Sequence, residues 1–88
     1  MDDMSVSLEL QNAGDVRLRS EIQAMIEHVL SGRPGDWRVA IVGSRAKDEW
    51  DMKVEGPNGF ERSYTLTGAA GEHEAGAIGN ILLQLLPR

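Results

Sequence analysis

The spacing of apolar residues changes along this chain, and that change constrains the fold more than any other feature. Over residues 5–11 apolar and polar side chains alternate, a pattern typical of a strand with one buried face. Over residues 16–31 the apolar positions recur every third or fourth residue, which predicts an amphipathic helix. Asp15 is the expected N-cap of this helix, and Gly32 is expected to end it. The chain therefore opens with a strand followed by a helix.

Period-two alternation then returns three times, over residues 37–42, 50–55 and 60–66, and predicts three further strands. Gly-Pro-Asn-Gly at 56–59 joins the last two, and these residue types suit the successive corners of a tight hairpin turn. Arg62 falls on the otherwise apolar face of the last strand. A charged side chain in that position indicates either that its stem lies along apolar surface with the charge at the sheet edge, or that this strand is itself an edge.

Residues 69–86 are predicted to form a second helix, although Gly71, Gly76 and Gly79 fall inside this segment. Each glycine inside a helix costs roughly 0.5–1 kcal/mol relative to alanine. We expect close approach of this helix to the sheet or to another chain to offset that cost.

The order of these segments is β-α-β-β-β-α, which predicts an α+β two-layer sandwich. The four strands are expected to form one mostly antiparallel sheet, with both helices on one face. If the first two strands are neighbours, the helix between them makes them parallel. At 88 residues the chain is expected to be a single domain, residues 1–88, with residues 1–4 frayed.

The composition is that of a soluble globular domain and restricts where the protein acts. No apolar run reaches the roughly 18–20 residues of a membrane span, and residues 1–4 do not resemble a secretion signal. The chain contains no cysteine, which excludes disulfides, thiolate metal sites and cysteine nucleophiles. We therefore expect a cytoplasmic protein that has no membrane partner.

Side chains that could carry chemistry do not assemble into a recognisable site. Glu-His-Glu at 72–74 and Glu-His at 27–28 offer metal ligands, but neighbours on a helix point about 100° apart and H-E-x-x-H is absent. Ser44 lacks the second glycine of G-x-S-x-G, and the carboxylates at 48–51 fit a charged strand rim. The sequence therefore predicts no catalytic, metal or cofactor residues, no small-molecule ligand and no enzymatic activity.

The last helix has an unusually wide apolar arc. Placed at 100° per residue, its apolar side chains cover roughly 200° of the circumference, whereas a helix on a two-layer fold needs about 100°. One explanation is that sheet curvature and the first helix cover the whole arc. The other, which we adopt as our prediction, is a surface for a protein partner, including a second copy in a homodimer. The residues expected to form it are Gly76, Gly79, Ile81, Leu83 and Leu86.

The order α-β-β-β-α after a leading strand resembles that of double-stranded-RNA-binding folds and of small ribosome-associated hibernation factors. The resemblance implies an alternative function, association with RNA or a ribosome, through the open sheet face or through Arg17, Arg33 and Arg45. Those modules place lysines at the start of the last helix, where this chain reads Gly-Glu-His-Glu at 71–74. A net charge of −5 also disfavours a polyanion, because affinity for nucleic acid depends on Lys and Arg. Nucleic acid is therefore the less favoured partner.

Overall fold

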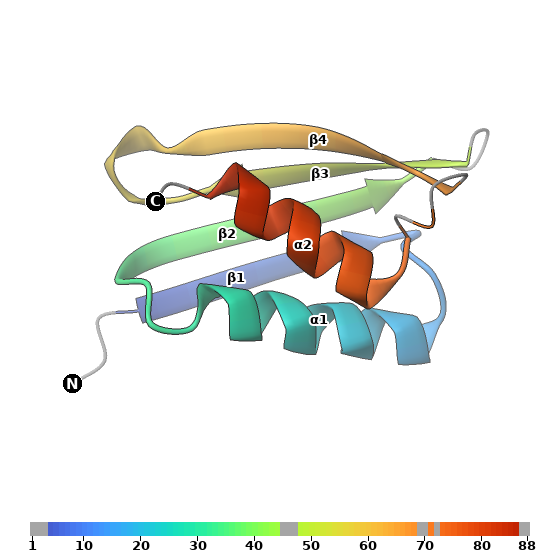
Figure 1. Ribbon diagram of the computed structural model, residues 1–88, viewed down its shortest axis with the longest axis horizontal. Coiled ribbons are helices and arrows are strands. Elements are labelled where there is room, and N and C mark those ends of the chain that lie inside the picture. Colours follow the sequence, from blue (N-terminus) through green and yellow to red (C-terminus); the bar gives the residue numbers. More distant parts are fainter. Residues whose placement is uncertain (1–3, 45–47, 69–70, 72, 87–88) are drawn as a thin grey trace.

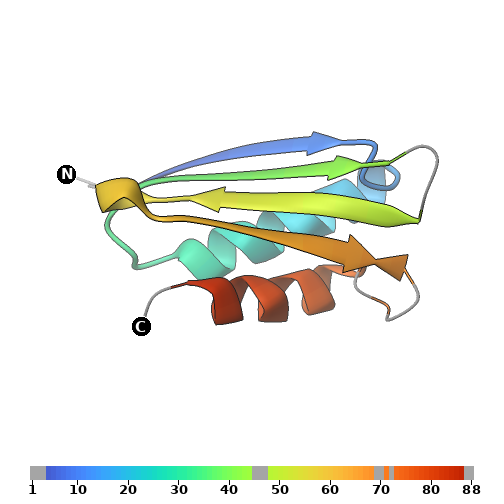
Figure 2. The same cartoon turned by 90° about the horizontal axis from the view of Figure 1, so that it is seen from above.

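The computed structural model describes residues 4–44, 48–68, 71 and 73–86, which form a four-stranded sheet with two helices on one face (Figures 1 and 2). No described helix is long and apolar enough to span a membrane. The predicted α+β sandwich and its element order are confirmed. The elements are β1 (Met4–Gln11), α1 (Val16–Leu30), β2 (Gly35–Gly43), β3 (Glu49–Glu55), the 3-10 turn η1 (Pro57–Gly59), β4 (Glu61–Thr67) and α2 (Ala75–Leu85).

The strands lie side by side in chain order, β1-β2-β3-β4, so β1 and β4 are the two edges of the sheet. β1 runs parallel to β2, with Met4 opposite Gly35, because α1 returns the chain to the same end of the sheet. β2, β3 and β4 are antiparallel neighbours. The sheet is thus mixed, and the edge position indicated by Arg62 is confirmed. Residue 4 already belongs to β1, and the rest of the segment expected to fray, residues 1–3, lies outside the described residues.

The core lies between one face of the sheet and the facing sides of both helices, which cover that face together (Figure 2). Alternate side chains of the two central strands point into it, because successive residues of a strand face opposite sides. Those strand residues are Trp37, Val39, Ile41, Trp50, Met52 and Val54, and the fully buried helix residues are Ile22, Ile26, Leu30, Ile78 and Leu82. The other face of the sheet carries mainly polar side chains, and no described helix covers it.

Two local sequence signals position the elements as expected. The carboxylate of Asp15 accepts a hydrogen bond from the amide of Leu18 at 2.8 Å and so caps α1. In the β3–β4 turn, Asn58 and Gly59 adopt φ values of 61° and 78°. Asparagine and glycine enter this left-handed region more readily than other residues, so the turn forms without strain at those two positions.

Helix α2 begins at Ala75, later than the predicted start at residue 69. Gly71 has a φ of 71°, which is outside the right-handed helical region. Its amide donates to the carbonyl of Gly68 at 3.0 Å, and the amide of Glu74 donates to the carbonyl of Gly71 at 3.3 Å. These contacts build turns rather than a helix. Residues 69, 70 and 72, which the prediction assigned to the helix, lie outside the described residues.

Candidate functional site

The five residues predicted to form a partner surface on α2 have different surroundings in the structure. Gly79 is buried and Leu86 is 5% exposed, so both are already engaged within the protomer. Ile81 is partly buried against the core, and Gly76 is exposed. Leu83 is 51% exposed and is the large apolar side chain of α2 that reaches solvent most clearly among the described residues. Binding of a partner by these residues remains a prediction, now centred on Leu83.

Most of the wide apolar arc of α2 is used inside the protomer. Ile78 and Leu82 are fully buried towards the sheet. Gly79 lies against α1, where a Cβ atom on residue 79 would be 2.6 Å from Cγ of Met25. The glycine therefore lets the two helices approach closely, whereas the sequence led us to expect a close contact with the sheet or with another chain. In this structure, the close neighbour is the first helix.

Alanine at the two glycines of α2 is expected to change stability in opposite directions. Gly76→Ala should stabilise by about 0.5–1 kcal/mol, because residue 76 has open space for a Cβ and alanine favours helix. Gly79→Ala should destabilise by about 1–3 kcal/mol, because the new methyl overlaps Met25. Urea unfolding of both variants measures the difference, and adding Met25→Ala should recover part of the loss. Equal gains at both positions would contradict a tight α1–α2 contact at Gly79.

A groove of about 380 Å³ runs between α1 and β1, on the helix-bearing face at the free edge of the sheet. Three apolar residues of β1 form one side of the groove. A largely polar stripe of α1 forms the other side. The lining residues are Val6, Leu8, Leu10, Val16, Arg19, Ser20, Gln23 and Glu27. The three β1 side chains are only partly buried, whereas their neighbours on β2 are buried. Val16 is 69% exposed, so this groove holds uncovered apolar surface at a free strand edge.

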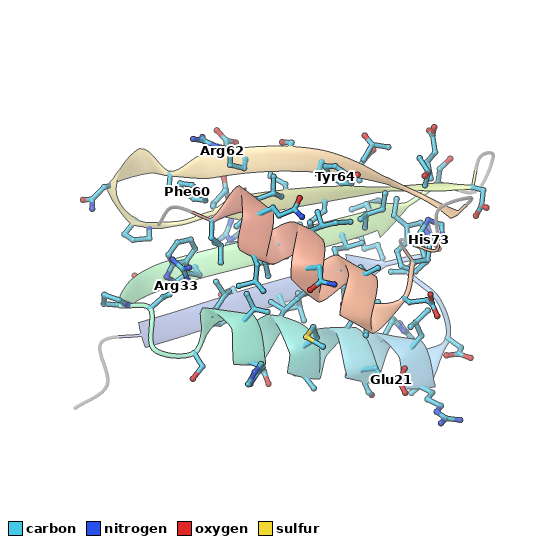
Figure 3. All side chains as sticks on the ribbon, viewed as in Figure 1. Glu21, Arg33, Phe60, Arg62, Tyr64 and His73 are labelled. Atoms are coloured by element: carbon cyan, nitrogen blue, oxygen red, sulfur yellow. The ribbon has the colours of Figure 1, made fainter. Side chains whose placement is uncertain are left out.

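The two edges of the sheet differ in how they are protected. β4 begins with Glu61 and Arg62; the register sets Arg62 opposite Val54, and its exposed side chain lies along the free edge of β4 (Figure 3). Its guanidinium lies 5.0 Å from the ring centre of Phe60 and donates to the carbonyl of Glu61 at 2.8 Å. A charged side chain at a free strand edge discourages a further strand from pairing. β1 has no Lys, Arg or Pro, and Glu9 is its single charged residue. The β1 edge is therefore the open one.

One polar atom in the groove has no hydrogen-bond partner among the described residues. Nε of Arg19 is buried, although the residue as a whole is only partly so. Buried polar atoms are normally hydrogen-bonded, so this Nε is an exception among the described residues. Further along the same side of the helix, Gln23 donates to the carboxylate of Glu27 at 3.3 Å. Sequence reasoning missed these groove residues, although Arg19, Gln23 and Glu27 recur every four residues on one helix face.

His73, from the segment that offered metal ligands in the sequence, has a structural role at the end of β4 (Figure 3). Its ring stacks on Trp50 with 4.0 Å between centroids and 2° between planes. Its Nε2 lies 3.4 Å from the carbonyl oxygen of Leu66, and its Nδ1 lies 3.7 Å from Asp48. Among the described residues, no group of three or more acidic or histidine side chains is placed to hold a metal ion. Glu72 lies outside them.

The other side chains considered for chemistry lie on the rim and the polar face of the sheet. The amide of Ser44 donates to the carbonyl of Glu49 at 2.9 Å, which closes the β2–β3 connection. Asp51 accepts a hydrogen bond from Thr65 at 3.3 Å.

Lys53 lies on the same polar face, in contact with the carboxylates of two neighbours. It reaches Glu61 at 2.8 Å and Glu55 at 3.6 Å. The hydrogen bond to Glu61, then its charge and that of Glu55, raise the pKa of Lys53 above the usual value for lysine. The Lys53–Glu61 pair crosses from β3 to β4 and the Lys53–Glu55 pair lies within β3, and both stand on a solvated face.

Comparison with known proteins shows the fold of this chain and not its family. No family model and no curated protein matches its sequence. Among solved structures, it is similar to the crystal structure of the Thermus thermophilus Protein Y N-terminal domain, with a TM-score of 0.51 and 11% identity. The match covers 94% of this chain and 100% of that domain. The likeness therefore extends over the whole sandwich, but no binding residue is transferred at this identity.

Proposed function

We propose that this chain is a non-enzymatic protein-interaction domain that acts in the cytoplasm and associates with a second copy of itself. The strongest support is the groove between α1 and β1, where apolar side chains lie partly exposed beside an unpaired strand edge. A protein strand can satisfy both features, because it supplies backbone hydrogen bonds and apolar side chains together. The absence of cysteine is compatible with a reducing compartment such as the cytoplasm.

The charges of the described residues favour protein over RNA as the partner. Arg17 pairs with Glu21 at 3.6 Å, and Lys53 pairs with Glu55 and Glu61. Such pairing leaves fewer positive charges for phosphates, which supply most of the affinity in nucleic-acid binding. Arg45, one of three arginines proposed for phosphate contact, lies outside the described residues. Binding of RNA or a ribosome is therefore the alternative function, and the RNA-binding measurement below tests it.

Two measurements on the full chain test this proposal together. Sedimentation equilibrium at micromolar concentration is expected to show a reversible dimer, with a mass above that of the 9.6 kDa chain. Filter binding with a double-stranded RNA probe at low and moderate salt is expected to show no salt-sensitive retention, because the net charge is −5. A strict monomer, or salt-sensitive RNA binding, would count against self-association as the function.

A further inference from the structure

We infer that two copies of this chain join their β1 edges antiparallel about a two-fold axis that passes near Leu8 and Gln23, forming one continuous sheet. The inference rests on the proposed function and names the surface that carries it. A closed pair of this kind is self-complementary, since the same patch on each copy meets its equivalent on the other. It removes both exposed β1 edges at once, which are the unprotected edges of the two sheets.

The backbone of β1 is suited to receive a further strand. On one side β1 pairs with β2 in continuous register from Met4 to Gln11, so it is extended and free of bulges. No described strand borders its other side. An exposed edge of this length presents unpaired amides and carbonyls that template another strand. Only Glu9 is charged, and its side chain points to the polar face, away from the groove.

The side chains of β1 determine the register of the pair. Residues that face each other across an antiparallel pair lie on the same side of the sheet. With the axis at Leu8, this residue meets Leu8 of the second copy, and Val6 meets Leu10 of the second copy. All three side chains line the groove in one protomer, so this register covers apolar surface with apolar surface. On the polar face, Ser7 then lies beside Glu9 of the second copy, which avoids a contact between like charges.

The charges on α1 independently agree with the same axis. Arg19 and Glu27 lie one on each side of Gln23, at equal spacing along the groove side of the helix. A two-fold axis at Gln23 runs the two α1 helices antiparallel and sets Arg19 of each copy opposite Glu27 of the other. Arg19 is partly exposed and Glu27 is exposed, so both side chains can reach a second copy. The pairing thus brings a guanidinium and a carboxylate of opposite charge together twice in one interface.

Charge reversal at these two residues tests the pairing by sedimentation. Arg19→Glu or Glu27→Arg places like charges together in each half of the interface and should weaken the dimer at least about tenfold. The double variant Arg19→Glu/Glu27→Arg restores opposite charges and should return the dissociation constant to within about threefold of the wild type. Arg17→Glu is the matched control, because Arg17 is exposed on the same helix outside the groove and should leave the dimer unchanged.

Cysteine cross-linking tests the position of the axis, since the wild-type chain has no cysteine. Gln23→Cys should form a covalent dimer under mild oxidation, because only residues near a two-fold axis meet their own equivalents. Ala24→Cys should not, because residue 24 is also exposed but lies about 100° further round the helix, outside the groove. Circular dichroism of each variant confirms that it is folded before association is measured.

The outcomes separate this inference from the proposed function. A wild-type chain that is monomeric at all concentrations contradicts both. A wild-type dimer that survives Arg19→Glu and Glu27→Arg, or that is not restored by the double variant, overturns the β1 interface and leaves self-association standing. In that case Leu83→Glu should dissociate the dimer, as the sequence-based surface on α2 predicts. Dissociation by either single reversal together with recovery in the double variant supports the β1 interface.

Discussion

Leu82→Glu is expected to unfold the domain. Leu82 is fully buried between α2 and the sheet, so the substitution removes an apolar side chain and places a carboxylate where it has no partner. Loss of the apolar contact costs about 2–3 kcal/mol, and burial of the charge costs several more. A chain of 88 residues has a total stability of roughly 4–13 kcal/mol, so the native state should be lost or nearly lost. Circular dichroism and one-dimensional NMR would show the loss of ordered structure.

Leu83→Glu is the matched control for this variant, and it also distinguishes the two candidate surfaces. Leu83 is the next residue on the same helix but is 51% exposed, so the same substitution should leave the protein folded, with stability changed by about 1 kcal/mol or less. If the β1 interface forms the dimer, the variant should remain dimeric. Dissociation of the dimer in a folded Leu83→Glu variant would show that the interface lies on α2 and not on β1. Unfolding of the variant would instead place Leu83 in the core.

The fold could be predicted because its strands and helices have separate apolar periods. Val6, Leu8 and Leu10 alternate with polar residues, and the structure places them opposite buried residues of β2. The shared helix face was predicted from the element order. The parallel β1–β2 pair was predicted on the condition that the first two strands are neighbours, because a helix between neighbouring strands returns the chain to the same end of the sheet. Asp15 predicted the start of α1, and Gly-Pro-Asn-Gly at 56–59 predicted the turn between β3 and β4. In the structure Asp15 caps α1 and the turn lies at these residues.

The predicted start of α2 was wrong because the spacing of apolar residues carries no information about the backbone conformation of a glycine. The prediction placed Gly71 inside the helix, but its φ of 71° is not helical, and α2 begins at Ala75. The role of Gly79 could not be predicted either, because it depends on contact with Met25, which is distant in the sequence. Predicting it would have required the angle at which the helices cross. Helix propensity gives the energetic cost of a glycine at residue 79, but it does not identify the contact that requires a glycine there.

The candidate groove was missed for a related reason. The sequence shows that Val6, Leu8 and Leu10 form one face of a strand, but not that this strand is an edge with one side open. Arg62 marked β4 as an edge because it is a charge on an apolar face. β1 has no charged residue on its apolar face, and the absence of such a charge leaves its edge open to a partner. An unprotected edge resembles an interior strand in sequence, so only the strand order reveals it.

Gly43→Ala is expected to destabilise the domain by about 3 kcal/mol or more, because no room exists for a Cβ at the end of β2. A methyl there would overlap the carbonyl oxygen of Asn12 and lie 2.9 Å from its carbonyl carbon and 3.0 Å from Cδ1 of Trp50. The carbonyl belongs to the backbone that leads from β1 towards α1, so the clash is relieved only by moving the strands apart.

Val42→Ala is the control for that clash, since Val42 precedes Gly43 on the same strand and points to the uncovered face, where it is 39% exposed. Its loss of stability should stay below about 1 kcal/mol, the range of strand propensity at such a site. Urea unfolding compares the stability of the two variants, and sedimentation at matched concentration compares their dimerisation. Because β1 is held against β2 at this point, a folded but loosened Gly43→Ala chain should also dimerise less if β1 forms the interface. A Gly43→Ala chain as stable as Val42→Ala would contradict the tight packing of Gly43 against Asn12.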